Sequence, residues 1–428
     1  MFNNKKSTLD RTLVAIDIAK KYNTVLVQSP NGKKRAFKMA NNKKDYLAFK
    51  GFLRSLPDIP LIAFEATGNY HRPLAYFLKR NGFAVRLISS VALARTRDAL
   101  FNTWDKNDPK DAQVILHLMK TGVTQTYRDP ILEETNDILE LSRTHFQVSL
   151  LKTRVQHSIL THFLPLYFPE MDKYYTQSRA QWFTQLLYRF PCPSAITCYT
   201  SDQFQTVAWD IVGRKVNKKG FLKDLYMTAQ ESIGLDVTEE SQAMGVFRLI
   251  LKEHMELCEK RDWIQKQAAG FLEDNHDFQR LKTLPGVGPI IALTILAEAG
   301  DLRRFSHHRK FLKYCGFDLA TQQSGQFRGQ SKISKRGNAR LRYVFWLAAT
   351  IAVRIRGNSF RRKFDRYMKN DPKNSDVKRK AYTAVAAKMA RVAYGLIKND
   401  TDYYPYHEES IPGGKIPSVR PVEATMTS

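Results

Sequence analysis

The sequence is poor in the residues that mark cross-linked, zinc-binding or membrane proteins. Only four of its 428 residues are cysteines, and none forms a C-x-x-C pair or has histidines at zinc-ligand spacing. We therefore expect reduced thiols. No apolar run approaches the roughly 20 residues that span a bilayer, and the N-terminal segment has no apolar signal-peptide core. The sequence predicts a cytoplasmic protein with no membrane partner.

Acidic residues are also scarce relative to basic ones. The chain has 41 Asp and Glu against 68 Lys and Arg, a formal net charge of +27. Such an excess repels itself unless a polyanion neutralises it, and the lysines and arginines are clustered rather than spread. This pattern favours DNA or RNA as the partner. A basic but unspecific surface, or attachment to a membrane surface, is the alternative.

Short apolar segments alternate with amphipathic ones in residues 1–128. Three strands joined by turns, followed by alternating helices and strands, are the order of a ribonuclease-H-like, RuvC-like α/β domain with a mixed sheet. The expected strands are 12–19, 23–29, 35–40, 61–68 and 83–89, and the expected helices are 47–56, 71–80 and one from near Pro109.

The rest of the chain is predicted to be mainly helical. Residues 129–275 form a helical region with moderate coiled-coil potential. The pattern alone predicts a long helix over 133–163, an irregular stretch over 167–223 and a second long helix from an N-cap at Thr238 to about Asp274. Residues 276–398 form a basic helical domain, and residues 399–428 a loosely ordered tail.

Four carboxylates in the first domain suggest a metal site. Asp17 and Glu65 lie in apolar strands, where a charge is costly unless it is paired or metal-bound. Asp108 and Asp111, in KNDPKDA, are three positions apart at the start of a helix and share one face. Each could instead pair with a lysine or cap a helix. Together they predict a divalent-metal phosphodiester centre.

Two glycine-containing segments of the basic domain suggest phosphate contacts. LKTLPGVGPIIA, with Gly286 and Gly288, predicts a helix-hairpin-helix-like turn whose amides can hold a phosphate, or a purely structural hairpin. The loop QQSGQFRGQSKISKRGNARLR offers cations to a phosphate backbone. These cations are Arg328, Lys332, Lys335, Arg336, Arg340 and Arg342.

The same loop contains three serines, Ser324, Ser331 and Ser334. A serine hydroxyl is a weak nucleophile unless its proton is removed and the phosphate is polarised. No histidine is close in sequence, so the residues alone leave open which serine, if any, is catalytic. Each could equally cap a helix or bind a phosphate.

Taken together, these motifs resemble the DEDD transposases of the bridge-RNA-guided insertion-sequence recombinases, a family that includes Piv-type DNA invertases. The resemblance lies in AIDIAK, FEATGNYHRPL, KNDPKDA, LPGVGPIIA and ISKRGNARLR, and covers most of residues 11–125 and 278–356.

The resemblance implies a tetramer-forming recombinase. Its RuvC-like domain would bind Mg²⁺, with Mn²⁺ as an alternative, through Asp17, Glu65, Asp108 and Asp111. Its serine would attack DNA to give a 5′-phosphoserine intermediate in a site shared between subunits. Alignment on Gly325 and ISKRG places that serine at Ser324, with Ser331 as the fallback. A structured guide RNA would pair with target and donor DNA, and the helical region 129–275 would serve for oligomerisation and RNA contact.

Two other functions compete with this one. A RuvC-like, structure-specific nuclease would use water as the nucleophile and Ser324 only to bind phosphate. A non-catalytic RNA- or DNA-binding scaffold would have structural acids and would be indifferent to magnesium.

Overall fold

The computed structural model describes residues 11–101, 108–177, 180–214, 216–320, 323–324, 327–328 and 332–404, and leaves undescribed the side chains of 108–109, 175–177, 323–324 and 327–328. Contacts divide the chain into two compact units, Met1–Asn136 and Asp137–Ser428. The domain boundaries at 128, 275 and 398 stay predictions. Residues 405–428 of the expected tail lie outside the described residues.

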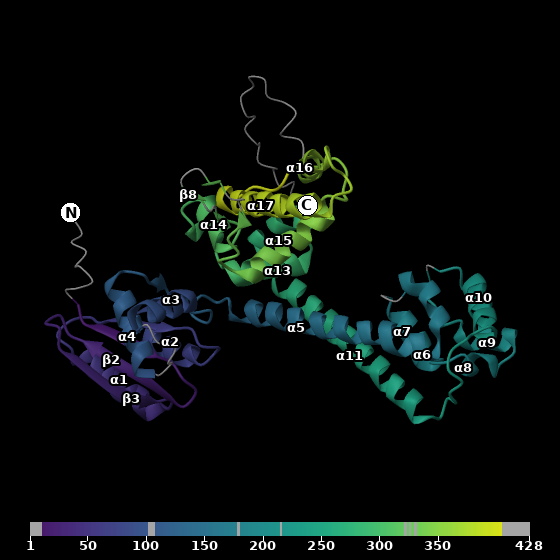
Figure 1. Cartoon of the computed structure of the whole chain (residues 1–428), viewed down its shortest axis with the longest axis horizontal. Helices are drawn as coiled ribbons and strands as arrows, with labels where there is room; N and C mark the ends of the chain where they lie inside the picture. The colour runs from purple at the N-terminus through teal and green to yellow at the C-terminus, as the bar shows by residue number, and fades with distance from the viewer. Residues whose placement is uncertain are drawn as a thin grey trace, which may run out of the picture. The chain divides into compact units, whose positions relative to one another are not determined.

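The first unit is built on a six-stranded mixed sheet in the order β3-β2-β1-β4-β5-β6 (Figure 1). Its strands are β1 (Leu13–Asp17), β2 (Tyr22–Gln28), β3 (Lys34–Ala40), β4 (Leu61–Glu65), β5 (Ala84–Ile88) and β6 (Gln125–Thr126). The first three pair antiparallel, whereas β1, β4 and β5 run parallel. The predicted mixed sheet is confirmed, with each expected strand present.

Helices cover both faces of this sheet. They are α1 (Lys43–Arg54), α2 (His71–Arg80), α3 (Ser90–Phe101) and α4 (Asp108–Lys120). Alternate residues of β1 point to opposite faces: Val14 and Ile16 pack in a core with α1 and α2, whereas Leu13 and Ala15 pack with α3 and α4. Burial on both faces explains why these strands are nearly continuous apolar runs.

Helix α3 was missed from the sequence. Its segment, SVALARTRDALF, buries only Leu93 fully, so it has almost no apolar periodicity to detect.

The second unit begins with α5 (Asn136–Ser158), which continues through a single π turn, η2 (Ile159–Phe163), into α6 (Leu164–Tyr167). The predicted helix over 133–163 is therefore confirmed within a few residues. The prediction of an irregular stretch over 167–223 was wrong. That stretch contains η3 (Pro169–Gln177), α7 (Gln181–Arg189), α8 (Ser194–Thr197), α9 (Ser201–Ala208) and the start of α10 (Lys218–Gln230).

Helix α11 (Gln242–Phe271) connects two apolar cores of this unit. Phe247 and Leu251 pack with the preceding short helices, whereas Ala268 packs with the C-terminal helices. Its N-cap is Ser241, whose side chain accepts from Met244 N at 3.3 Å. The predicted cap at Thr238 was therefore wrong by one turn.

The C-terminal helices surround a helix that is apolar on nearly every side, α13 (Pro289–Ala299). The others are α12 (His276–Lys282), η4 (Leu302–Arg304), α14 (His308–Tyr314), α15 (Ala339–Ala352), α16 (Ser359–Met368) and α17 (Ser375–Asn399). Within the described ranges, no helix combines the length and the apolarity needed to cross a membrane.

A buried histidine lies where α11 meets α7. His254 is 2% exposed, and its Nδ1 lies 3.1 Å from Thr184 Oγ1. Burial, followed by the positive charges of Lys152 and Arg261, lowers the pKa of His254 to about 4. The folded state therefore holds this imidazole neutral.

Acid should weaken the fold through His254. Because its folded pKa lies below the unfolded value of about 6.5, its contribution is complete above pH 6.5 and is lost as pH falls toward 4. We expect the thermal midpoint to fall less between pH 7 and pH 5 in His254→Gln than in the wild type. Circular dichroism melts measure this, with the exposed His157→Gln as control. Equal falls in both variants would contradict the assignment.

Candidate active site

Two of the predicted metal ligands lie side by side at the ends of parallel strands. The register pairs Ile16 with Phe64, so the next residues, Asp17 and Glu65, follow at the carboxyl ends of β1 and β4. Both continue the alternation of Ala15 and thus face the α3 and α4 side of the sheet. Both are half-buried. Neighbouring strands lie about 4.8 Å apart, so this register brings two carboxylates together.

The third predicted ligand, Asp111, approaches the same face of the sheet from α4. It is 3% exposed and precedes Ala112, which packs in the core against β1. Arg97 of α3 lies 2.6 Å from it, Nε to Oδ1. The two atoms form a close ion pair but lack hydrogen-bond geometry. Arg97 is a partner that the sequence did not reveal.

The described acids do not form a metal-binding cluster in this structure. Among the described residues, no three Asp, Glu, His or Cys side chains lie close enough to hold one ion. The carboxylate of Asp108, which begins α4, and the neighbouring Asp105 lie outside the described side chains. The donors at hand are carboxylate oxygens on one sheet face, which suit a hard cation such as Mg²⁺. Arg97 competes with such a cation for Asp111.

A hollow of about 550 Å³ lies between the start of α1 and α2, on the sheet face opposite the one that Asp17 and Glu65 face. Lys20 comes three residues after Asp17, and Asn69 and Tyr70 come shortly after Glu65. Tyr70 is exposed and can offer a ring to an unstacked base. Chain order alone could have indicated these residues, because segments leaving parallel strands meet at one sheet edge.

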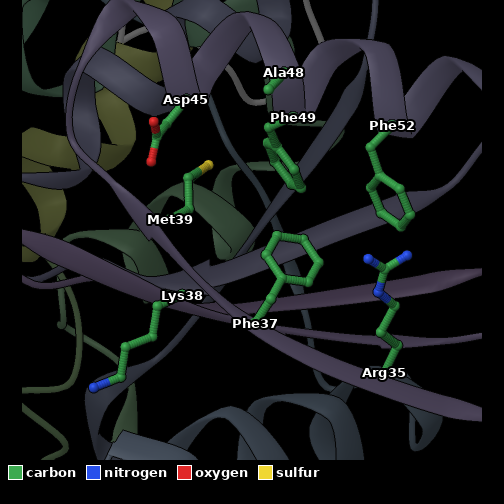
Figure 2. A pocket seen from close by; sticks show the side chains of 8 residues that line it. All are labelled: Arg35, Phe37, Lys38, Met39, Asp45, Ala48, Phe49 and Phe52. Atoms are coloured by element: carbon green, nitrogen blue, oxygen red, sulfur yellow. The ribbon is translucent and has the colours of Figure 1, made fainter.

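A second hollow in this unit has a structural explanation. Figure 2 shows the side chains between β3 and α1 that line this space of about 210 Å³. The Arg35 guanidinium lies 5.4 Å from the centre of the Phe52 ring. The one acid lining it, Asp45, accepts from Ala40 N at 2.8 Å. These contacts stabilise the join of strand and helix.

The glycine turn between α12 and α13 is packed against backbone. Gly286 has a φ of +82°, and a Cβ there would lie 2.4 Å from the Ala348 carbonyl oxygen. Any side chain would force the turn away from α15. The glycine therefore has a packing role, and the phosphate contacts proposed for Gly286 and Gly288 stay predictions.

The serine loop is tied at its base by backbone pairing. β7 (Leu319–Ala320) pairs with β10 (Lys332–Ile333), and Ser334 N donates to Asp318 O at 2.6 Å. Ser324 lies in β8 (Gln323–Ser324), opposite Phe327 of β9 (Phe327–Arg328). The side chains of Ser324 and Arg328, and all of Gly325 and Ser331, lie outside the described residues.

The predicted cations of this loop divide into two groups. Lys332, Lys335 and Arg336 are exposed. In contrast, Arg342 Nη1 donates to the carbonyls of Cys315 and Lys335, at 3.4 and 3.2 Å.

Arg340 belongs to the internal group because it contacts Glu298, whose side chain is 8% exposed. Its Nη1 lies 3.4 Å from Glu298 Oε1, and its guanidinium lies 5.3 Å from the Phe146 ring centre. Asn338 Nδ2 donates to the same carboxylate at 2.7 Å, and Arg143 lies 4.0 Å from it. Arg340 therefore fixes the start of α15, a role that its charge did not indicate.

Two regions of the chain match known protein families. Residues 14–169 match the family described as Transposase, with the IS110 DEDD domain, and residues 278–365 match the Transposase IS116/IS110/IS902 family. Both matched models describe transposases, and together they cover the two ends of the chain. The acidic strand ends fall in the first matched region, and the serine loop in the second.

Curated relatives agree with this assignment. A "Probable family 20 transposase" of Pseudomonas aeruginosa is 29% identical, over 38% of this chain and 48% of the relative. The transposase for insertion sequence element IS1111A of Coxiella burnetii is 26% identical, over 43% and 50%. The chain thus spans about half the length of these two relatives. An uncharacterized 44.8 kDa protein of insertion element IS116 from Streptomyces clavuligerus is 22% identical, over 82% and 86%.

Solved structures were also matched. Among them is the RuvC of T. thermophilus in complex with a Holliday junction substrate, at 11% identity and a TM-score of 0.20, over 27% of this chain and 99% of RuvC. A score this low supports no conclusion.

The two groups of loop cations should respond differently to truncation. Arg340→Ala removes the closer of the two arginines from the buried Glu298 carboxylate, which keeps its bond from Asn338, and should lower the free energy of unfolding by about 1 kcal/mol. Arg336→Ala removes an exposed cation and should change it by less than about 0.5 kcal/mol. Urea denaturation of both variants measures the difference. Equal stabilities would show that the Glu298 contact contributes nothing.

Proposed function

We propose that the chain is an RNA-guided DNA transposase of an insertion sequence, which cuts and rejoins DNA. The observation that carries the proposal is the pairing, on one chain, of two domains. One has acids on adjacent parallel strands, and the other has a basic loop with a serine. The net charge of +27 suits a protein that holds nucleic acids.

The acids would serve as the metal ligands. Asp17, Glu65, Asp108 and Asp111 would bind Mg²⁺, or Mn²⁺, and the bound cation would neutralise charge on the scissile phosphate and favour ionisation of the attacking hydroxyl. For Asp111 this requires release from Arg97. Arg97 would then be free to contact a phosphate oxygen, so the pair would act as a switch between empty and loaded sites.

Ser324 would be the nucleophile. Its Oγ forms a bond to phosphorus while the bond from phosphorus to the 3′ oxygen breaks, which leaves a 5′-phosphoserine and a free 3′ end. The hydroxyl loses a proton and the departing 3′ oxygen gains one, so the step is balanced in protons. The reverse attack by a 3′ hydroxyl would rejoin a strand and release the serine.

The remaining parts of the chain would assemble the complex. The serine and the acids would come from different subunits of a tetramer, with the long helices α5 and α11 as the oligomerisation and RNA-contacting elements. Both helices expose large apolar side chains, among them Leu150, Leu151, Leu249 and Trp263. A structured guide RNA would be held through its backbone by lysines and arginines.

Substitution of Ser324 should abolish the covalent intermediate. With the wild-type protein, magnesium, guide RNA and labelled DNA, we expect a protein–DNA adduct that survives a denaturing gel. Ser324→Ala should show none, because no other hydroxyl occupies its place in the hairpin. Ser331→Ala and Ser334→Ala are the matched controls from the same loop.

The pattern of products separates the competing mechanisms. An adduct that persists in Ser324→Ala and disappears in Ser331→Ala moves the nucleophile to Ser331. Free 5′-phosphate ends with no adduct in any protein indicate a nuclease that uses water.

Neutralising a strand-end acid should abolish cutting but not binding. Asp17→Asn or Glu65→Gln removes one charged metal ligand, which should slow strand cleavage by about a thousandfold or more. RNA affinity should change little. Asp45→Asn, a substitution in the neighbouring helix, is the control for general damage. Retained recombination in Asp17→Asn would contradict the metal site.

A further inference from the structure

A second strongly basic surface lies in the C-terminal helices. A groove of about 1100 Å³ runs between α16 and α17. Among the described residues that line it there are five cations and no acid: Arg362, Lys363, Arg366, Lys388 and Arg391. It is separate in sequence from the serine loop and from every nucleic-acid contact predicted above.

The groove forms because α16 packs on α17 through its aromatic residues. Phe360 is fully buried, and Phe364 lies 4.8 Å from Tyr382, ring centre to ring centre. Arg362, Lys363 and Arg366 lie beside this apolar stripe on α16. Packing of the aromatic stripe therefore lines up the cations of α16 with those of α17 along one seam.

The cations of the groove are held close enough to repel one another. Burial, and then the positive charges of Arg391, Lys388 and Arg366, lower the pKa of the Lys363 ammonium. By contrast, Arg361 is not among the residues that line the groove, and it pairs with Asp365 at 2.9 Å. The one acid of α16 thus neutralises a cation outside the groove.

The shape and chemistry of the groove fit a nucleic-acid backbone. Arg362 and Arg366 are one helical turn apart, about 6 Å along the axis, so they can contact successive phosphates of one strand. Only one aromatic side chain, Tyr367, lines the groove. Recognition of single-stranded RNA relies on several stacking rings, so the cation-rich lining favours the backbone of duplex DNA.

We propose that the groove between α16 and α17 binds the phosphate backbone of duplex DNA, independently of sequence. The proposal rests on the proposed transposase function and adds a DNA-binding site away from the reacting phosphate. Helix α15 packs against both α16 and α17 and begins just after the serine loop. DNA bound in the groove would therefore lie at a fixed position relative to that loop.

The test measures duplex affinity of the full chain at several salt concentrations. Arg366→Gln with Arg391→Gln removes two exposed cations of the groove. Lys378→Gln with Lys380→Gln removes two exposed cations of α17 outside it and is the matched control. We expect the groove variant to weaken binding roughly tenfold and to lower the slope of log K against log salt by about 2. The control should change little.

Two further measurements guard against a folding defect. The groove variant should melt no lower than the wild type, because repulsion is relieved. The conservative Arg366→Lys with Arg391→Lys should restore most of the affinity.

The outcomes separate this proposal from the proposed function. If the groove variant and the control bind duplex DNA with equal affinity and slope, the groove proposal is overturned. If the groove variant loses structured RNA but keeps duplex DNA, the groove is an RNA site and the proposal is likewise overturned. If the wild-type chain does not bind DNA at all, the transposase function itself fails.

Discussion

The metal chemistry that we propose for this protein depends on two carboxylates that the fold places side by side. The parallel register of β1 and β4 puts Asp17 and Glu65 next to each other on one face of the sheet, where solvent screens them only in part. The surrounding structure must supply positive charge. Arg97 does so for Asp111, and a divalent cation would do so for the pair. The groove between α16 and α17 is the opposite case, because its closely spaced cations favour a negatively charged partner.

Much of the first unit could be predicted from the sequence because apolar runs and turns identify strands directly. The positions of Asp17 and Glu65 at strand ends followed from the runs themselves. Helix α3 did not, since it exposes most of its side chains. The partner of Asp111 lies on that helix, fourteen residues earlier, and only the packing of α3 on α4 reveals it.

The second unit was harder for a different physical reason. Residues 167–223 combine aromatics and proline, which indicated irregular structure, but their short helices are stabilised by caps and mutual packing. Thr200 and Gln203, for example, form a complete capping box. The cationic loop also showed contacts that its charges did not indicate: Arg340 and Arg342 have the charge expected of DNA contacts, and Glu298 and backbone carbonyls engage them within the fold. The charge of an arginine alone does not show whether its side chain pairs within the protein or contacts a partner.

The clamped base of the serine loop has an evolutionary consequence. The pairing of β7 with β10 and the hydrogen bond from Ser334 N to Asp318 O hold the two ends of the loop together. Residues between these points can then vary at little cost to the helical core. Selection can therefore change these residues, apart from the proposed nucleophile Ser324, without first finding compensating changes in the fold. The sequence of the loop can thus differ among related proteins while the helices that hold it keep their packing.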